Sequence, residues 1–292
     1  MIHYGSVCSG IEGASVAWQH LGWRPVWFAE IEKHCSALLK EKYPHVHNFG
    51  DMELISRGKA EPIDLLVGGT PCQSFSVNGK RAGMDDARGN LARTYMRIIE
   101  NFRPRWVIWE NVPNVLRTNG GRDFGSIVGS LAHIGYGWAY RVLDARHFGL
   151  PQRRKRLFLV GHSGNSSAAF AALFDRSTVL ENGTATDETQ EDCVAGIEGR
   201  VDGWTGDTTP KRGAGVVPTL RAQQGGEGVG VVVNGRLRKL TLTEWERLQG
   251  LPDGYTSCMN SDTARRSAIG NGFPVNVMQW IGERIAFLES LT

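Results

Sequence analysis

The sequence has few cysteines, and their spacing is not that of a disulfide framework or a zinc site. The 292 residues contain five of them, an odd number, and no two form a C-x-x-C pair. The chain is therefore no disulfide-stapled miniprotein, no metal site is predicted, and a reduced compartment is expected. The five are Cys8, Cys35, Cys72, Cys193 and Cys258.

Long apolar runs are also missing. No stretch approaches the roughly 20 apolar residues of a membrane helix, and the N-terminus lacks a basic segment followed by an apolar one. Hydrophobic residues make up 41% of the chain and charged residues 22%, with a mean hydropathy of -0.27, which is typical of a folded protein. The sequence predicts a cytoplasmic protein of one or two domains without a membrane association.

The chain has no strong excess of either charge. It holds 33 Lys and Arg against 30 Asp and Glu, so its net charge of +3 permits a polyanionic partner without requiring one. Residues 163–237 differ from the rest, because they hold 13 of the 37 glycines and six Lys and Arg against ten Asp and Glu. We expect this stretch to form a separate region.

Residues 4–162 alternate between short β-branched or aromatic runs and longer segments of helical period. This alternation is typical of a parallel sheet covered by helices, so an α/β fold is predicted. Ligands bind such sheets at the carboxyl ends of the strands. We expect strands over 4–7, 24–30, 63–67, 106–110, 140–144 and 157–161, and helices over 13–21, 31–43, 90–102, 123–134, 240–248 and 275–288.

Two strand ends carry candidate reactive groups. Cys72 follows the strand 63–67 and is a candidate nucleophile, because the thiolate is the reactive form of cysteine and nearby positive charge favours it. Glu110 ends another strand, where partial burial would raise its pKa and suit it to donate a proton. Taken singly, each has an ordinary structural alternative, a buried thiol and a solvated strand cap.

Two further segments are candidate binding sites. In the run 152–156, alternate residues share one face of an extended chain, so Arg154 and Arg156 could meet a phosphate, a base carbonyl or the carboxylate of Glu110, or form a solvated turn. The glycine-containing loop 6–13 lets a ligand approach backbone N–H groups, and Glu30 and Asp51 follow later in the chain, where Glu30 ends the second strand.

In this order, the segments resemble the motifs of the DNA (cytosine-5) methyltransferase family of bacteria and phages. The resemblance runs from the N-terminus to about Gln279, with residues 163–237 unmatched. Its motifs are PCQSFS at 71–76, the helix start RGNL at 88–91, ENV at 110–112, QRRKR at 152–156, RKLTLTEWERLQGLP at 238–252 and GN at 270–271.

The resemblance implies two domains. One is a Rossmann-like S-adenosylmethionine-dependent methyltransferase domain, residues 1–162 plus 272–292. The other, residues 163–271, is a smaller, loop-rich target-recognition domain with the returning motif region. Double-stranded DNA is the implied partner, and the chain is expected to act as a monomer, with a cognate restriction enzyme left open.

The resemblance also implies a mechanism in which a cytosine leaves the DNA stack. The thiolate of Cys72 attacks C6, Glu110 protonates N3, and C5 takes the methyl group before Cys72 is released. Arg154 and Arg156 match positions that bind the flipped nucleotide and Glu110, and Asn111 braces the loop of Cys72. The implied DNA contacts are Gln73, Ser76, Arg154 and Arg221.

The implied cofactor is S-adenosylmethionine, with S-adenosylhomocysteine as product. Three positions depart from the family pattern Asp-x-Phe-x-Gly-x-Gly-Gly, namely Ser6, Cys8 and Glu12, and a reduced cofactor affinity is predicted. The expected cofactor-binding residues are Cys8, Ser9, Gly10, Gly13, Glu30, Ile31, Asp51, Met52, Gly68, Asn271 and Phe273.

Three other functions remain open from the sequence. A tRNA cytosine-5 methyltransferase would use the same chemistry on another nucleic acid. A catalytically silent DNA-binding regulator would need none of the reactive residues, so the presence of Cys72 and Glu110 argues against it. A thiol hydrolase would need a histidine partner, for which His147 is the nearest candidate.

Overall fold

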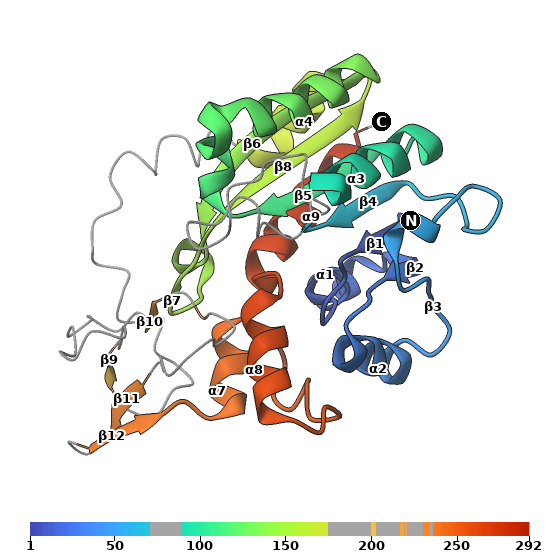
Figure 1. Cartoon of the computed structure of the whole chain (residues 1–292). Helices are drawn as coiled ribbons and strands as arrows, with labels where there is room; N and C mark the ends of the chain where they lie inside the picture. Colours follow the sequence, from blue (N-terminus) through green and yellow to red (C-terminus); the bar gives the residue numbers. More distant parts are fainter. Residues whose placement is uncertain are drawn as a thin grey trace.

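A mixed seven-stranded sheet forms the centre of the computed structural model (Figure 1). The structure describes residues 1–70, 89–174, 200–202, 217–218, 220, 230–233 and 236–291. The strand order is β3-β2-β1-β4-β5-β8-β6. These strands are β1 (His3–Val7), β2 (Arg24–Ala29), β3 (His47–Asn48), β4 (Leu65–Gly68), β5 (Trp106–Asn111), β6 (Tyr136–Asp144) and β8 (Lys155–Ser163).

One strand corrects the expected parallel sheet. The pairings among β1 to β5 are parallel, but β8 runs antiparallel to both β5 and β6. The hydrophobic pattern of a buried strand is the same in either direction, so the sequence could not reveal this reversal. The six expected strands are present, and the two-residue strand β3 was not expected.

Helices cover both faces of the sheet, so the central strands are buried on both sides, whereas the edge strand β6 exposes Tyr140 and Val142. Along β5, Trp106 and Ile108 belong to one hydrophobic cluster, whereas Val107 and Trp109 belong to the other. This alternation follows from the two-residue period of a strand. The helices are α1 (Gly13–Trp18), α2 (Lys33–Lys42), α3 (Gly89–Phe102), α4 (Arg122–His133), α5 (Ser166–Leu173), α7 (Leu242–Leu248), α8 (Asp262–Asn271) and α9 (Val275–Glu289).

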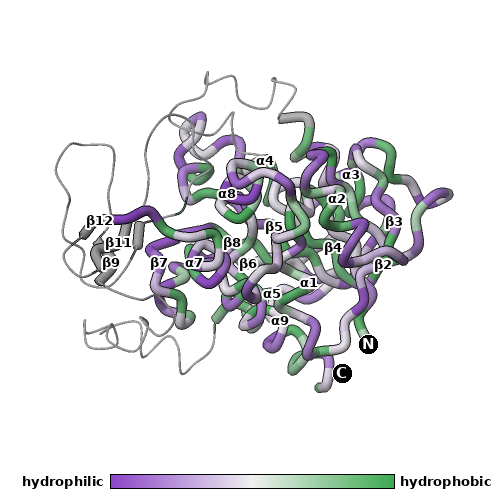
Figure 2. The backbone as a smooth tube through the Cα atoms, turned by 90° about the horizontal axis from the view of Figure 1, so that it is seen from below, coloured by the Kyte–Doolittle hydropathy of each residue, from purple (hydrophilic) through white to green (hydrophobic). Residues whose placement is uncertain are grey.

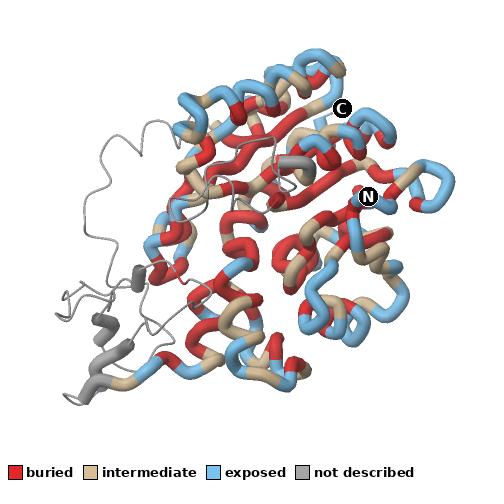
Figure 3. Tube along the Cα trace, viewed as in Figure 1, coloured by how far each residue is buried: buried red, intermediate tan, exposed pale blue. Residues whose placement is uncertain are grey.

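The two clusters take their helices from different parts of the chain. Tyr95, Ile98 and Ile99 of α3 pack in the cluster that includes Val107, while Val277 and Ile281 of α9 pack in the other. Figure 2 shows hydrophobic and hydrophilic residues mixed along the outer helices, and Figure 3 shows buried residues concentrated in the central strands. None of the helices in the described part of the chain has the length and composition of a bilayer-spanning segment.

The C-terminal part returns to the sheet. Helix α9 packs on α1 and α5, and α5 itself packs on β6 and β8. The layer over the sheet thus continues to Leu173, beyond the expected boundary at residue 162, and the division into two domains stays a prediction. Smaller strands form two further sheets. One contains β9 (Arg200–Asp202), β11 (Gly230–Val233) and β12 (Arg236–Lys239), and the other contains β7 (Gln152–Arg153) and β10 (Val217–Pro218).

Candidate active site

A cavity of about 860 Å³ lies where β1, β2, β4 and β5 end, and α8 closes it from the other side. Its position agrees with the rule that α/β sheets bind ligands at the carboxyl ends of their strands. One end, here called the acidic end, is lined by Cys8, Gly10, Glu30, Ile31, Asp51 and Met52. The other, the Glu110 end, is lined by Thr70, Glu110, Asn111, Val112 and Arg156, and Asn271 of α8 also faces the cavity.

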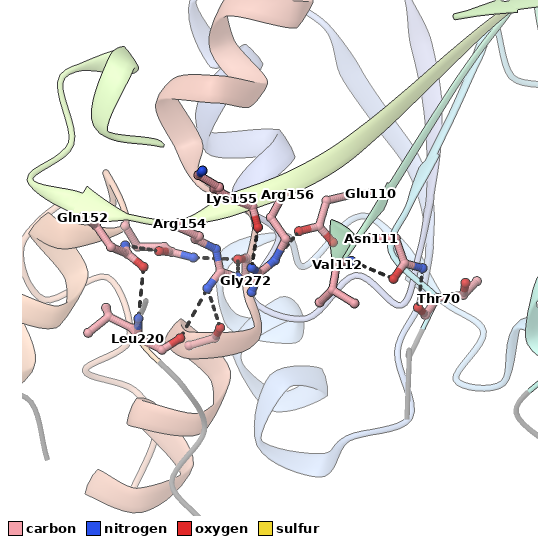
Figure 4. Close-up of polar contacts among 12 residues, drawn as sticks. Thr70, Glu110, Asn111, Val112, Gln152, Arg154, Lys155, Arg156, Leu220 and Gly272 are labelled. Atoms are coloured by element: carbon pink, nitrogen blue, oxygen red, sulfur yellow. Dashed lines mark hydrogen bonds and ion pairs between the residues drawn. The ribbon is translucent and has the colours of Figure 1, made fainter. Parts of the chain in front are cut away.

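Glu110 and Arg156 form a nearly buried ion pair at the Glu110 end. Arg156 Nε lies 3.0 Å from Glu110 Oε1, and the two side chains are 15% and 12% exposed. The contact of this enclosed oxygen within the described part of the chain is the ion pair with Arg156 (Figure 4). Burial raises the pKa of Glu110, while the charges of Arg156 and Arg154 lower it.

Asn111 contacts Thr70, the last described residue before the Cys72 loop, and its expected bracing of that loop stays a prediction. Its amide donates to the carbonyl of Thr70 at 3.4 Å, and its Oδ1 accepts from the Val112 N–H at 2.7 Å (Figure 4). Trp109 Nε1 donates to Thr70 Oγ1 at 3.0 Å. Two side chains of β5 therefore fix Thr70, which lies two positions before Cys72.

Arg154 lines the same cavity as Glu110, and its hydrogen bonds run to backbone carbonyls. Only 1% exposed, it donates to the carbonyls of Gly270 at 3.0 Å, Gly272 at 2.9 Å and Leu220 at 3.4 Å (Figure 4). A guanidinium engaged with three backbone carbonyls ties the end of α8 to β8. Its expected contact with a nucleotide and with DNA stays a prediction.

Glu30 organises the acidic end. Its Oε2 accepts from the Gly10 N–H and its Oε1 from the Glu32 N–H, both at 2.7 Å. Burial raises the pKa of Glu30, whereas these two N–H groups lower it. Asp51 accepts from the Glu53 N–H at 2.9 Å and begins the short 3-10 helix Met52–Leu54.

Cys8 lines the same end but is not set up as a nucleophile. Burial, with smaller effects from Glu30 and Asp51, raises the pKa of its thiol to about 12, so the thiol is neutral near pH 7. Its Sγ lies 4.0 Å from the Sδ of Met52. Cys8 thus contributes a small apolar wall.

Several expected cofactor residues do not line the cavity themselves but pack next to the residues that do. Ser9 is buried and donates to the carbonyl of Ser6. Gly13 lies against Phe273, because a Cβ on Gly13 would be 3.1 Å from the Phe273 carbonyl oxygen, and Gly68 is the buried last residue of β4. Cys72, Gln73, Ser76 and Arg221 lie outside the described residues.

The sequence did not predict the contacts of Ser6, Glu12 and Gln152. Ser6 donates to Glu12 at 2.8 Å beneath the loop that carries Gly10. Gln152 donates to the carbonyl of Leu248 at 2.8 Å and accepts from the Leu220 N–H at 3.2 Å. The one available signal was that positions 6 and 12 depart from the family pattern together.

His147 has no part in the cavity. It lies in the 3-10 helix Ala145–Phe148, and its Nε2 accepts from Arg146 Nε at 3.2 Å. No group of three or more His, Cys, Asp and Glu within the described ranges is arranged to hold a metal ion. The polar side chains that line the cavity include carboxyl, amide, guanidinium and hydroxyl groups.

The fold is that of known methyltransferases. The crystal structure of the Dnmt2 methyltransferase of S. pombe superimposes with a TM-score of 0.74 at 16% identity, covering 100% of both chains. At this identity the likeness concerns the fold.

Sequence comparison specifies the family. The model of the C-5 cytosine-specific DNA methylases matches residues 2–197 and 198–286, so the chain belongs to this family of DNA cytosine-5 methyltransferases. The Type II methyltransferase M2.BsuMI of Bacillus subtilis is 30% identical over 302 residues, which cover 96% of this chain and 74% of the relative.

A phage relative carries a different printed name. A protein of Escherichia phage P1 called DNA N-6-adenine-methyltransferase is 37% identical over 233 residues. These cover 61% of this chain but only 31% of the phage protein. Its name describes a protein of which the larger part lies outside the match.

Proposed function

We propose that the chain takes a methyl group from S-adenosylmethionine and delivers it to C5 of a cytosine that has left the stack of double-stranded DNA. The observation that carries this proposal is the Glu110–Arg156 pair, held at 3.0 Å in the cavity that also contains the acidic end. A buried acid beside an arginine suits a group that binds and protonates a base.

The acidic end suits an adenosyl donor. Glu30 accepts one N–H on each carboxylate oxygen, and each oxygen keeps a lone pair for a ribose hydroxyl. Cys8, Ile31 and Met52 offer apolar contacts for adenine, and Asp51 a carboxylate for its amino group. When bound, S-adenosylmethionine supplies an electrophilic methyl group on a sulfonium, a cation that these carboxylates attract.

Two residues of the chain carry the chemistry on the base. The Cys72 thiolate adds to C6 while protonated Glu110 gives its proton to N3, so the electron pair of the C5–C6 bond becomes available at C5. C5 bonds to the methyl carbon as the methyl–sulfur bond breaks. Water then takes the C5 proton, the C5–C6 double bond re-forms as Cys72 leaves C6, and N3 returns its proton to Glu110.

Neighbouring residues position these two. Arg156 holds Glu110 and offers N–H donors to the base, and Asn111 fixes Thr70 ahead of the Cys72 loop. Gln73, Ser76, Arg154 and Arg221 are proposed DNA contacts. The protein is proposed to act as a monomer, and a cognate restriction enzyme fits the Type II names of its relatives.

The test is an incubation of the protein with labelled S-adenosylmethionine and either unmethylated DNA or tRNA, followed by nucleoside analysis. The expected product is 5-methylcytosine in DNA, absent with Cys72→Ser. Label in N6-methyladenine, or in tRNA alone, would overturn the proposed substrate. No label in either, from a folded protein, would overturn the proposed activity and favour a silent DNA-binding regulator.

A further inference from the structure

Glu12 is an unusual residue for its place in the chain. It precedes α1 with φ 56° and ψ 51°, a left-handed conformation that costs a residue with a Cβ about 1 kcal/mol or more. Its side chain is also fully buried. A strained backbone and a buried carboxyl are both unfavourable, so the contacts of this side chain must offset them.

Those contacts form a continuous polar network. Ser6 Oγ donates to Glu12 Oε2 at 2.8 Å, and Ser15 Oγ donates to Oε1 at 3.0 Å. Tyr4 OH lies 2.6 Å from Ser15 Oγ, and because Ser15 uses its hydrogen on Glu12, Tyr4 is the donor of that bond. The ionised carboxylate thus accepts from two hydroxyl groups, and the hydroxyl of Tyr4 joins the network through Ser15.

The same loop is held at two further points. Tyr255 OH donates to the carbonyl of Ile11 at 2.9 Å, and the Gly10 N–H donates to Glu30 at 2.7 Å. Cys8 and Gly10 both have positive φ, 49° and 56°. A loop with three left-handed residues holds one shape only when its surroundings fix it, and this loop forms a wall of the acidic end.

We propose that Glu12 is a positioning residue for the methyl donor: its carboxylate, held by Ser6 and Ser15, keeps the loop between β1 and α1 in the shape that binds S-adenosylmethionine. This inference rests on the proposed function, since it assumes that the acidic end holds this donor. The family pattern places an Asp at position 6 and a Gly at position 12. In this chain the carboxylate stands at position 12 instead of position 6, and Ser6 donates a hydrogen bond to it.

Donor binding should then depend on pH. Burial raises the pKa of Glu12 to about 7, although the hydroxyls of Ser6 and Ser15 lower it, and Glu30 adds to the rise. Other titratable groups that interact with it are Tyr4, Tyr43 and Tyr255, with Lys42 over the Tyr255 ring. Below pH 7 one carboxyl oxygen of Glu12 carries a proton, so the side chain no longer accepts hydrogen bonds from both Ser6 and Ser15. The loop is then held less firmly, and its affinity for the methyl donor falls.

The test measures the affinity of S-adenosylhomocysteine by calorimetry at pH 6, 7 and 8, which needs no turnover. For the wild type we expect affinity to rise about fivefold from pH 6 to pH 8, which is the change that follows if binding lowers the Glu12 pKa by one unit from about 7. For Glu12→Gln, a neutral side chain of the same size, we expect the weak pH 6 affinity throughout. The ligand's own amino group titrates equally in both proteins.

A second variant separates a positioning role from a general loss of stability. Ser6→Asp with Glu12→Gly returns the carboxylate to position 6 and a glycine to the left-handed position, so we expect affinity at pH 8 within about threefold of the wild type. This pair also carries the test if Glu12→Gln does not fold.

The outcomes are distinct. A Glu12→Gln protein with wild-type affinity and wild-type pH dependence would overturn the inference alone, and so would a double variant that folds but stays weak. A wild-type protein that binds no S-adenosylhomocysteine at any of the three pH values would overturn the proposed donor, and the inference with it.

Discussion

The two ends of the cavity handle charge in opposite ways. At the Glu110 end, the acid faces Arg156 at 3.0 Å, so the charge is balanced within the protein. At the acidic end, Glu30 accepts backbone N–H groups and has no cationic partner in the described part of the chain. The negative charge is therefore compensated at the Glu110 end and uncompensated at the acidic end.

This difference separates chemistry from binding. A balanced pair holds a proton donor at a fixed place and tunes its pKa. Uncompensated carboxylates favour a cationic ligand, and backbone N–H groups restrict their orientation. We therefore expect variants at the Glu110 end to change the rate of methyl transfer, and variants at the acidic end to change donor affinity.

The largest effect is expected for Glu110→Gln. The amide has the size of the acid but cannot protonate the base, so the single-turnover rate of methyl transfer should fall by about 100- to 10,000-fold. S-adenosylhomocysteine affinity should stay within about twofold of the wild type. Rapid-quench kinetics and calorimetry measure the two quantities, and a comparable loss in both would break the division between the ends.

The two arginines should differ in what they support. Removing the buried guanidinium in Arg154→Ala leaves three carbonyls without their donor, so we expect a loss of about 2 to 3 kcal/mol in the free energy of unfolding. Arg156→Ala, the matched control, should lose less, because Glu110, whose pKa burial already raises, can take up a proton once the guanidinium is gone. Urea denaturation measures both free energies of unfolding. Equal losses would show that Arg154 does not stabilise the fold through its contacts with the three carbonyls.

Arg156→Ala should instead change the pH profile of the rate. The Arg156 charge lowers the pKa of Glu110, so its removal raises that pKa further above the ordinary value. A proton donor loses activity as the pH rises through its pKa, and the alkaline limb should therefore move to higher pH. A limb that stays in place or moves to lower pH would contradict the assignment of Glu110 as the donor.

The smallest effect is expected at Cys8. A Cys8→Phe variant adds an aromatic face beside Met52, and about 1 kcal/mol of added contact would tighten donor binding about fivefold. Cys8→Leu is the control, because it adds apolar volume without an aromatic face and has the same left-handed backbone to satisfy. Unchanged or weaker affinity in Cys8→Phe would show that donor binding in this protein does not suffer from the lack of the Phe that the family pattern has at this position.

Periodicity predicted most of the fold. Local patterns determine that β5 is a strand buried on both faces and that α9 is a helix with one apolar stripe, and both are present at nearly the expected residues. The antiparallel direction of β8 was not predictable, because it depends on how distant segments pair. The expected boundary after residue 162 reflected a change in composition, whereas α5 still packs on the sheet.

The site was predicted less evenly. The alternation of residues 152–156 placed Arg154 and Arg156 on one face, but the sequence could not tell that the first meets backbone carbonyls and the second meets Glu110. Glu30 was found because strand ends bind ligands. The bond between Ser6 and Glu12 was missed, since it depends on a left-handed backbone that a glutamate rarely adopts.

A covalent trap tests the central claim most directly. In DNA that carries 5-fluorocytosine, fluorine replaces the C5 proton that must be removed before Cys72 can leave. The enzyme therefore cannot release Cys72 after methyl transfer. With S-adenosylmethionine present, the account predicts a protein–DNA complex that survives a denaturing gel, and none with Cys72→Ser. A folded wild-type protein that methylates DNA yet forms no such complex would contradict the covalent mechanism.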